Sequence, residues 1–141
     1  MVFVYPRQIF FGETDAAGVL YFANALNICH EAYEASLGQF GIDLQNFFAG
    51  NSVAVPITHA SIDYRRPSYC GDQQQIHLRP RLTSETDFSV QYVIFNLEQQ
   101  ILSQAKTHHV AISTGDRKRA PLPSMLQQWI QKYDVDDLVT N

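Results

Sequence analysis

One aspartate, Asp15, stands in a stretch of small residues that leaves room for a substrate to approach the backbone. The segment reads Thr14-Asp15-Ala16-Ala17-Gly18-Val19-Leu20-Tyr21-Phe22, and helical spacing begins at about Val19. The free N–H groups and the dipole at a helix N-terminus favour developing negative charge, as in an oxyanion hole. Asp15 could therefore attack a substrate carbonyl itself or activate a water beside it. The alternative role is capping of the helix, since aspartate is a common N-cap.

A run of basic residues, Arg117-Lys118-Arg119, stands out because the chain has a formal net charge of −4. Arginine binds phosphate oxygens in a bidentate geometry, so Arg117 and Arg119 are candidate contacts for a phosphate-bearing substrate. The alternative is a basic loop that only faces solvent. Arg65 and Arg66 are weaker candidates for the same role.

The histidines offer one candidate for ligand binding and none for a metal site. His59 lies in a β-rich run, where it could hydrogen-bond a hydroxyl group of an aromatic ligand or be a satisfied histidine of a partly buried strand. His108 and His109 point to opposite faces of their predicted strand, so they cannot readily chelate one ion together. Cys29 and Cys70 have no suitable partner spacing either. We therefore expect no metal ion.

Two carboxylates on the predicted helix, Glu31 and Glu34, raise the question of a second acidic group. At 1.5 Å per residue, Glu31 would lie roughly 20 Å along the helix from Asp15 and could not easily serve the same carbonyl. Solvated helix surface is the expected role. Several aromatic residues could form walls for a flat ligand, although such spacings are more often those of a core: Tyr21, Phe22, Phe47, Phe48 and Tyr64.

The hydrophobic pattern indicates the elements that must position these groups. A long helix is predicted over 19–37, with Gly38 and Gly41 suited to its termination and a short helical turn at 44–49. Its apolar stripe contains Phe22, Leu26, Cys29, Tyr33 and Leu37. Strands are predicted over 2–11, 53–64, 73–82, 88–96 and 101–114, and a closing helix over 123–133. Such an order is typical of an α+β domain whose helix covers one face of an antiparallel sheet.

The composition limits the classes of protein to consider. The 141 residues suit one domain over 1–141, and 45% hydrophobic with 17% charged residues is typical of a globular chain. The negative net charge argues against a nucleic-acid partner. No apolar stretch approaches the roughly 18–20 residues of a membrane span, and no secretory signal pattern is present. Two cysteines are too few for a disulfide framework, so we expect a reducing cytoplasm.

The Asp15 segment closely resembles the active-site signature of hotdog thioesterases of the 4-hydroxybenzoyl-CoA type. In that family a carboxylate precedes the central helix, and an N–H in the first helical turn polarises the thioester carbonyl. The resemblance implies that Asp15 is the catalytic carboxylate and that the Phe22 backbone N–H is the donor. It covers nearly the whole chain, and Tyr64-Arg65-Arg66-Pro67 followed by Gly71-Asp72 looks like the second landmark of the family.

Other segments resemble, within this family, the subgroup that acts on 1,4-dihydroxy-2-naphthoyl-CoA in phylloquinone and menaquinone synthesis. These segments are 29–34, 59–63, 107–110 and 117–123. The resemblance implies a hotdog fold, with a roughly five-stranded antiparallel sheet wrapped around the helix, and hydrolysis of the thioester to an acid and coenzyme A without a metal or redox cofactor. His59, Arg117 and Arg119 would contact the substrate.

The resemblance also implies an assembly. Two chains would pair edge strands into a homodimer, doubled to a homotetramer, with active sites at subunit interfaces that join Asp15 of one chain to pocket residues of its neighbour. Nucleophilic and general-base roles for Asp15 remain equally open.

Three alternatives differ in function. The chain could act on another aryl-CoA or a short fatty acyl-CoA, or it could be a non-catalytic acyl-CoA sensor, since a fold does not fix a function. A pure binder needs no carboxylate near the carbonyl, which speaks against the sensor. A dehydratase would call for a His/acid pair, and none is evident around Asp15. A serine-hydrolase elbow and a phosphate-binding loop are likewise missing from the sequence.

Overall fold

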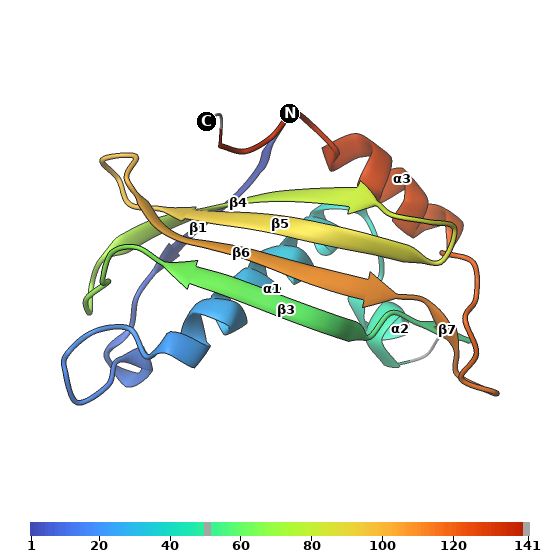
Figure 1. The fold of residues 1–141 in the computed structure, drawn as a ribbon, viewed down its shortest axis with the longest axis horizontal. Coiled ribbons are helices and arrows are strands. Elements are labelled where there is room, and N and C mark those ends of the chain that lie inside the picture. Colours follow the sequence, from blue (N-terminus) through green and yellow to red (C-terminus); the bar gives the residue numbers. More distant parts are fainter. Residues whose placement is uncertain (50–51, 140–141) are drawn as a thin grey trace.

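A long helix packs against one face of a five-stranded antiparallel sheet in the computed structural model, which describes residues 1–49 and 52–139 (Figure 1). The helix is α1 (Phe22–Phe40). The strands, in spatial order, are β1 (Phe3–Gln8), β4 (Gln73–Leu82), β5 (Asp87–Phe95), β6 (Ile101–Val110) and β3 (Ile57–Tyr64). This arrangement confirms the expected α+β class and the helix-wrapping sheet of a hotdog fold.

Smaller elements complete the described chain. They are the 3-10 helix η1 (Phe11–Glu13), the helices α2 (Leu44–Ala49) and α3 (Ser124–Tyr133), and a ribbon of β2 (Val53–Ala54) with β7 (Ile112–Ser113). The second helical turn and the closing helix are thereby confirmed, whereas the predicted 53–64 strand is split because Pro56 interrupts it. None of the helices among the described residues is long and apolar enough to cross a membrane.

The bounds of α1 differ from the predicted 19–37. Val19 and Leu20 are held in isolated β-bridges to neighbouring segments, so their backbone cannot begin the helix. At the other end Gly38 stays inside α1, and the helix ends at Gly41. Gly41 has φ 106°, a left-handed conformation that glycine adopts without a Cβ penalty.

The core lies between α1 and the sheet, and α3 closes one side of it. Cys29, Tyr33 and Leu37 of the predicted stripe are fully buried, whereas Phe22 is 60% exposed. Their main partners are Ile76, Leu78, Phe88, Tyr92, Ile94 and Trp129. Burial of each large apolar side chain contributes about 1.5–3 kcal/mol, which explains why this stripe orients α1. The exposed Phe22 marks the end of the helix that the core does not cover.

The strand β3 forms one edge of the sheet. It pairs with β6 on one side only, and its side chains are mostly exposed. The Tyr64 end of β3 lies beside the start of α1, because the Tyr64 hydroxyl donates to the Phe22 carbonyl at 2.7 Å. The opposite end, at Ile57, lies near α2. This edge strand therefore connects the two ends of the molecule.

Candidate active site

Asp15 lies in a closed turn between η1 and α1. Its backbone N–H donates to the Val19 carbonyl at 2.9 Å, and the Gly18 N–H donates back to the Asp15 carbonyl at 2.9 Å. Gly18 has φ 80°, which favours glycine at this position. The turn holds Asp15 at the surface, with its side chain exposed.

The Asp15 carboxylate is held by one of its two oxygens. Its Oδ1 accepts the Ala17 N–H at 2.9 Å, whereas Oδ2 makes no hydrogen bond within the described residues. The helix begins only at Phe22, where the N-cap residue Tyr21 supplies no side-chain hydrogen bond. Capping of α1 by Asp15 is therefore wrong, because the turn closes before the helix starts. The free oxygen can attack a carbonyl carbon or accept a proton from water.

The first turn of α1 offers backbone N–H groups to a ligand. Phe22 is the first helical residue, so its N–H has no acceptor within the helix. The first turn contains no acidic side chain that would compete for these groups. The helix dipole adds partial positive charge at the same place. The start of α1 is thus suited to stabilise an oxyanion.

Arg7 ties the Asp15 turn to β1 and to α1. Its guanidinium donates to the Glu13 carboxylate at 2.7 Å and to the Glu31 carboxylate at 2.6 Å. The hydrogen bond from Arg7 lowers the pKa of Glu13. The Glu13 carbonyl accepts the Tyr21 N–H and the Asn24 side-chain amide, each at 2.9 Å. The cluster therefore anchors both ends of the turn. Glu31 lies on the solvated surface of the helix, as expected, and in addition pairs with Arg7.

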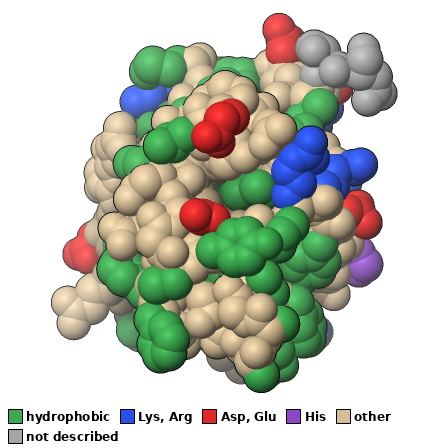
Figure 2. Space-filling model, turned by 90° about the vertical axis from the view of Figure 1, so that its left-hand side faces the viewer, with side chains coloured by type: hydrophobic (Ala, Val, Ile, Leu, Met, Phe, Trp, Pro, Cys, Tyr) green, Lys and Arg blue, Asp and Glu red, His purple; other side chains and the backbone are tan. Residues whose placement is uncertain are grey.

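A cavity of about 300 Å³ lies beside the start of α1, between Leu20, Tyr64 and the two basic residues Arg65 and Arg66. Figure 2 looks directly at this end of the molecule, where hydrophobic side chains gather around acidic groups and a basic patch lies to one side. The exposed aromatic residues of the 10–22 and 64–69 segments are Phe10, Phe11, Tyr21, Phe22, Tyr64 and Tyr69. Exposed apolar surface of this kind is typical of an interaction site.

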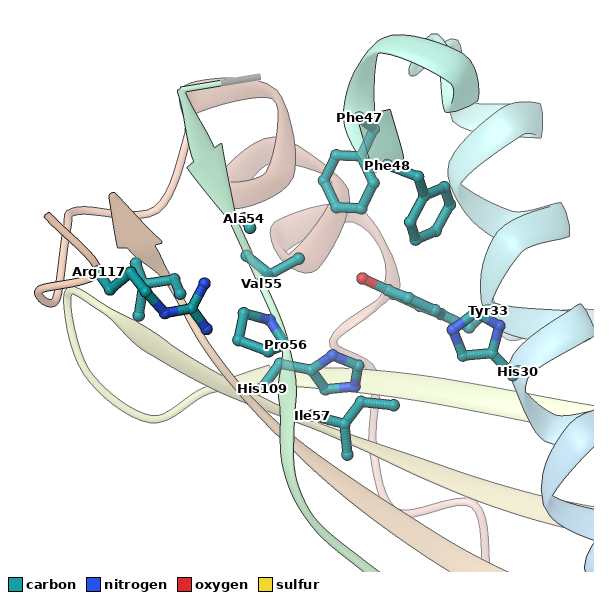
Figure 3. Close-up of a pocket in the computed structure, with 11 residues that line it drawn as sticks. His30, Tyr33, Phe47, Phe48, Ala54, Val55, Pro56, Ile57, His109 and Arg117 are labelled. Atoms are coloured by element: carbon teal, nitrogen blue, oxygen red, sulfur yellow. The ribbon is translucent and has the colours of Figure 1, made fainter. Parts of the chain in front are cut away.

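A second cavity, of about 360 Å³, lies between the middle of α1 and the helix α2 (Figure 3). His30 and Tyr33 of α1 form one side of it, and Phe47 and Phe48 of α2 form another. The remaining walls come from the 54–57 segment, His109, Ile112 and Arg117. Along the helix, Tyr33 is about 16 Å from Phe22 at 1.5 Å per residue. The Asp15 turn and this cavity are therefore separate within one chain.

The structure places the two predicted phosphate contacts near the second cavity. They differ in whether the arginine already forms an ion pair. Arg117 lines the cavity and makes no ion pair within the described residues. Arg119 donates to Oδ1 of Asp87 at 2.8 Å, and Nε2 of His108 is 3.0 Å from Oδ2 of the same carboxylate. The Thr86 hydroxyl, with His108 and Arg119, lowers the pKa of Asp87 to about 2. Arg119 is therefore already neutralised by an internal carboxylate.

His59 is not brought to either cavity within one chain. It lies directly opposite His108 in the β3–β6 register, after an irregularity between Ile57 and His59. His108 bonds Asp87 on the outer face of the sheet, whereas His109 is 1% exposed in the core. The prediction that His108 and His109 occupy opposite faces is confirmed. Among the described residues no cluster of His, Cys, Asp and Glu could hold a metal ion.

The second cavity also contains groups that sequence patterns assign no role. The helical stripe predicts Tyr33 as a core residue, and nothing in the sequence connects it with His109. In the structure their ring centroids are 5.0 Å apart. Only the packing of α1 on β6 brings these two residues together.

Residues 9–130 match the Thioesterase-like superfamily, and the chain belongs to this superfamily. A 1,4-dihydroxy-2-naphthoyl-CoA hydrolase of Microcystis aeruginosa is 51% identical over 126 residues, which are 89% of this chain and 91% of that protein. A hydrolase of the same name from Crocosphaera subtropica is 46% identical over 134 residues, 94% of this chain and 98% of that protein. The crystal structure of a 1,4-dihydroxy-2-naphthoyl-CoA thioesterase from Synechocystis superposes with a TM-score of 0.90 at 41% identity, covering 96% of this chain and 99% of that chain.

Proposed function

We propose that this chain hydrolyses 1,4-dihydroxy-2-naphthoyl-CoA to the free acid and coenzyme A, a step of phylloquinone and menaquinone synthesis. The main support is the similarity along nearly the whole chain to hydrolases of that name, 51% identical in the case of Microcystis aeruginosa. The Asp15 turn supplies the chemistry, because it presents a carboxylate oxygen that has no partner among the described residues, shortly before a helix without a side-chain cap.

Two routes give the same products from this arrangement. In both, the thioester carbonyl accepts the Phe22 N–H, which stabilises the developing oxyanion. In the first, Asp15 attacks the carbonyl carbon and expels coenzyme A thiolate, and water then hydrolyses the mixed anhydride. In the second, Asp15 takes a proton from a water that attacks the carbonyl directly, and the same thiolate leaves. Neither route uses a metal or a redox cofactor, and we propose that none is bound.

A second copy of the chain would complete the site. The outer edge of β3 has no neighbour in this chain, so two β3 edges can pair antiparallel about a two-fold axis. Such pairing sets the Tyr64 end of one β3 beside the Ile57 end of the other. It therefore brings Asp15 of one copy to the 360 Å³ cavity of its neighbour. We infer a homodimer of this kind, doubled to a homotetramer.

The remaining substrate contacts follow from this composite site. Arg117 lines the same cavity and is free to bind a phosphate of coenzyme A, whereas Arg119 would first have to leave Asp87. His59 lies on β3, where it could reach the substrate only across the paired edges. Cys29 and Cys70 are free thiols, in keeping with a cytoplasmic enzyme.

The test is thiol release from 1,4-dihydroxy-2-naphthoyl-CoA, benzoyl-CoA and a short aliphatic acyl-CoA. We expect the naphthoyl thioester to be strongly preferred, and Asp15→Asn to lower kcat by at least about 10²-fold. Asp136→Asn, the same change at an exposed residue near the C-terminus, is the control and should retain activity.

Each other outcome has a definite meaning. Broad activity with the same dependence on Asp15 would support the proposed role of Asp15 in thioester hydrolysis and reject the proposed substrate. Binding of all three thioesters without thiol release would favour a non-catalytic acyl-CoA sensor.

A further inference from the structure

The 360 Å³ cavity contains a buried hydroxyl group that has no hydrogen-bond partner among residues 1–49 and 52–139. Tyr33 is 1% exposed, and its Oη makes no hydrogen bond within the described residues. Figure 3 shows this oxygen pointing from α1 into the space that faces Val55 and the α2 phenylalanines. A buried hydroxyl without a partner lowers the stability of the free protein. A ligand that hydrogen-bonds Tyr33 would remove this cost.

His109 provides a second polar atom beside Tyr33. Its Nε2 lies 2.8 Å from the Thr107 hydroxyl, and its ring stacks on Phe88 with centroids 4.5 Å apart. Its Nδ1 is near the Val55 backbone without a well-formed hydrogen bond. Burial lowers the pKa of His109 to about 4, so the ring is neutral at pH 7. The cavity thus offers neutral hydrogen-bonding groups.

The other walls suit a flat, uncharged ring. Phe47, Phe48 and His30 are aromatic, and none of the described residues that line the cavity is a carboxylate. Among these same residues, only Arg117 carries a fixed charge. Ligand pockets typically start at about 300 Å³ and combine apolar walls with a few placed polar groups. The chemistry therefore matches a hydroxylated aromatic ring better than an aliphatic chain.

We propose that Tyr33 recognises a ring hydroxyl of the aromatic acyl group and is a specificity-determining residue of the composite site. This proposal rests on the proposed thioesterase function and on the pairing of two β3 strands, which sets one copy's Asp15 beside the other copy's cavity. A phenol can donate to a ring hydroxyl or accept from it. An unhydroxylated ring would enter the cavity but leave Tyr33 unpaired.

The test compares 1,4-dihydroxy-2-naphthoyl-CoA with 2-naphthoyl-CoA for the wild type and for Tyr33→Phe. We expect Tyr33→Phe to lower kcat/KM for the hydroxylated thioester by about tenfold and to leave that for 2-naphthoyl-CoA within about twofold. The variant should melt at the same temperature as the wild type or higher, because it removes an unpaired buried hydroxyl.

Tyr92→Phe is the matched control. Tyr92 is equally buried, but its hydroxyl lies 3.3 Å from that of Thr107. Its loss should lower the melting temperature and leave the preference for the hydroxylated thioester unchanged. If Tyr33→Phe instead lowers the melting temperature and slows both thioesters equally, Tyr33 is only a core residue.

A binding measurement separates this proposal from the thioesterase function. Trp129, the only tryptophan, lies 5.7 Å from Tyr33 between ring centroids, so its fluorescence should report occupancy of the cavity. The probes are 1,4-dihydroxy-2-naphthoate and 2-naphthoate. Tighter binding of the hydroxylated acid by the wild type, reduced about tenfold in Tyr33→Phe, supports the proposal even if no thioester is hydrolysed. If the wild type and Tyr33→Phe bind 1,4-dihydroxy-2-naphthoate equally tightly, the proposal is overturned.

Discussion

At the end of the molecule where α1 begins, the surface is open, and one carboxylate oxygen of Asp15 has no partner in the part of the chain that the structure describes. At the opposite end, where β5 begins, Asp87 is largely buried, and both of its carboxylate oxygens are occupied. The first end offers a reactive group and free helix amides, but its cavity of about 300 Å³ is lined mainly by aliphatic and polar residues rather than by aromatic ones. The second offers an aromatic cavity but no free carboxylate.

Asp87, the carboxylate whose pKa is lowered, belongs to a structural network of side chains. Thr86, His108 and Arg119 hold the pKa of Asp87 at about 2, and these contacts leave no oxygen for a substrate. Asp15 has a single backbone partner and is chemically available. A lowered pKa can come from a structural ion-pair network as readily as from an active site. The two ends are complementary, and antiparallel pairing of two β3 edges would join them.

Mixed dimers give the largest expected effect. Asp15→Asn removes the reactive group, and Ala54→Trp fills the cavity of its own chain. Each variant alone should retain below about 1% of wild-type thiol release, whereas co-expression should restore about a quarter, because half of the dimers are mixed and one of their two sites is intact.

The control for the mixing experiment is Ala54→Ser, which leaves the cavity open and should be active alone. The measurement is thiol release by the co-purified mixture with differently tagged chains. No recovery in a mixture proven to contain heterodimers would place the whole site within one chain.

Asp87→Asn tests the structural carboxylate. Because the folded pKa is about 2, below the ordinary 3.8, the charge stabilises the protein above about pH 4, and this contribution is lost as the pH falls toward 2. We expect the variant to lose about 1.5 kcal/mol of unfolding free energy at pH 7. Denaturation at pH 7 and at pH 2 should show that most of the difference is lost in acid. Asp15→Asn should change stability by less than about 0.5 kcal/mol at either pH.

Tyr21→Asp tests whether the open helix start serves catalysis. An aspartate at this N-cap should stabilise the protein by about 1 kcal/mol. It should also lower kcat/KM about tenfold, because the new carboxylate occupies first-turn amides and repels the oxyanion. Tyr21→Asn should give a similar gain in stability with a smaller loss of activity. Full activity in Tyr21→Asp would show that these amides do not act on the substrate.

The glycines at the far end of α1 give the smallest effect. Gly41→Ala should cost about 1 kcal/mol, because alanine is strained at φ 106°. Gly38→Ala should instead gain about 0.5–1 kcal/mol, since this residue is helical and its Cβ would only touch Leu44 at 3.5 Å. Urea denaturation measures both, and thiol release should be unchanged. Equal effects of the two substitutions would contradict the different roles of the two residues.

Local patterns predicted the elements well and the contacts between them poorly. The alternation of apolar and polar residues predicted β4 over 73–82, and the helical spacing of apolar residues predicted one long helix. Both patterns depend only on residues close together in the sequence. The start of α1 was placed too early, because Val19 is bridged to Tyr69 and the Leu20 N–H donates to the Ser68 carbonyl, both in a distant segment. For the same reason the pairing of Arg119 with Asp87, and of Arg7 with Glu31, could not be foreseen.

The sequence by itself determined the α+β class, the superfamily and the aspartate expected to react, because these reside in local periodicity and in one contiguous signature. The tertiary structure decided that Asp15 is a turn residue rather than a helix cap. It also decided that Tyr33 and His109 meet in a cavity remote from Asp15. Such relations depend on strand register and on the packing of α1 on the sheet, which bring together side chains far apart along the chain.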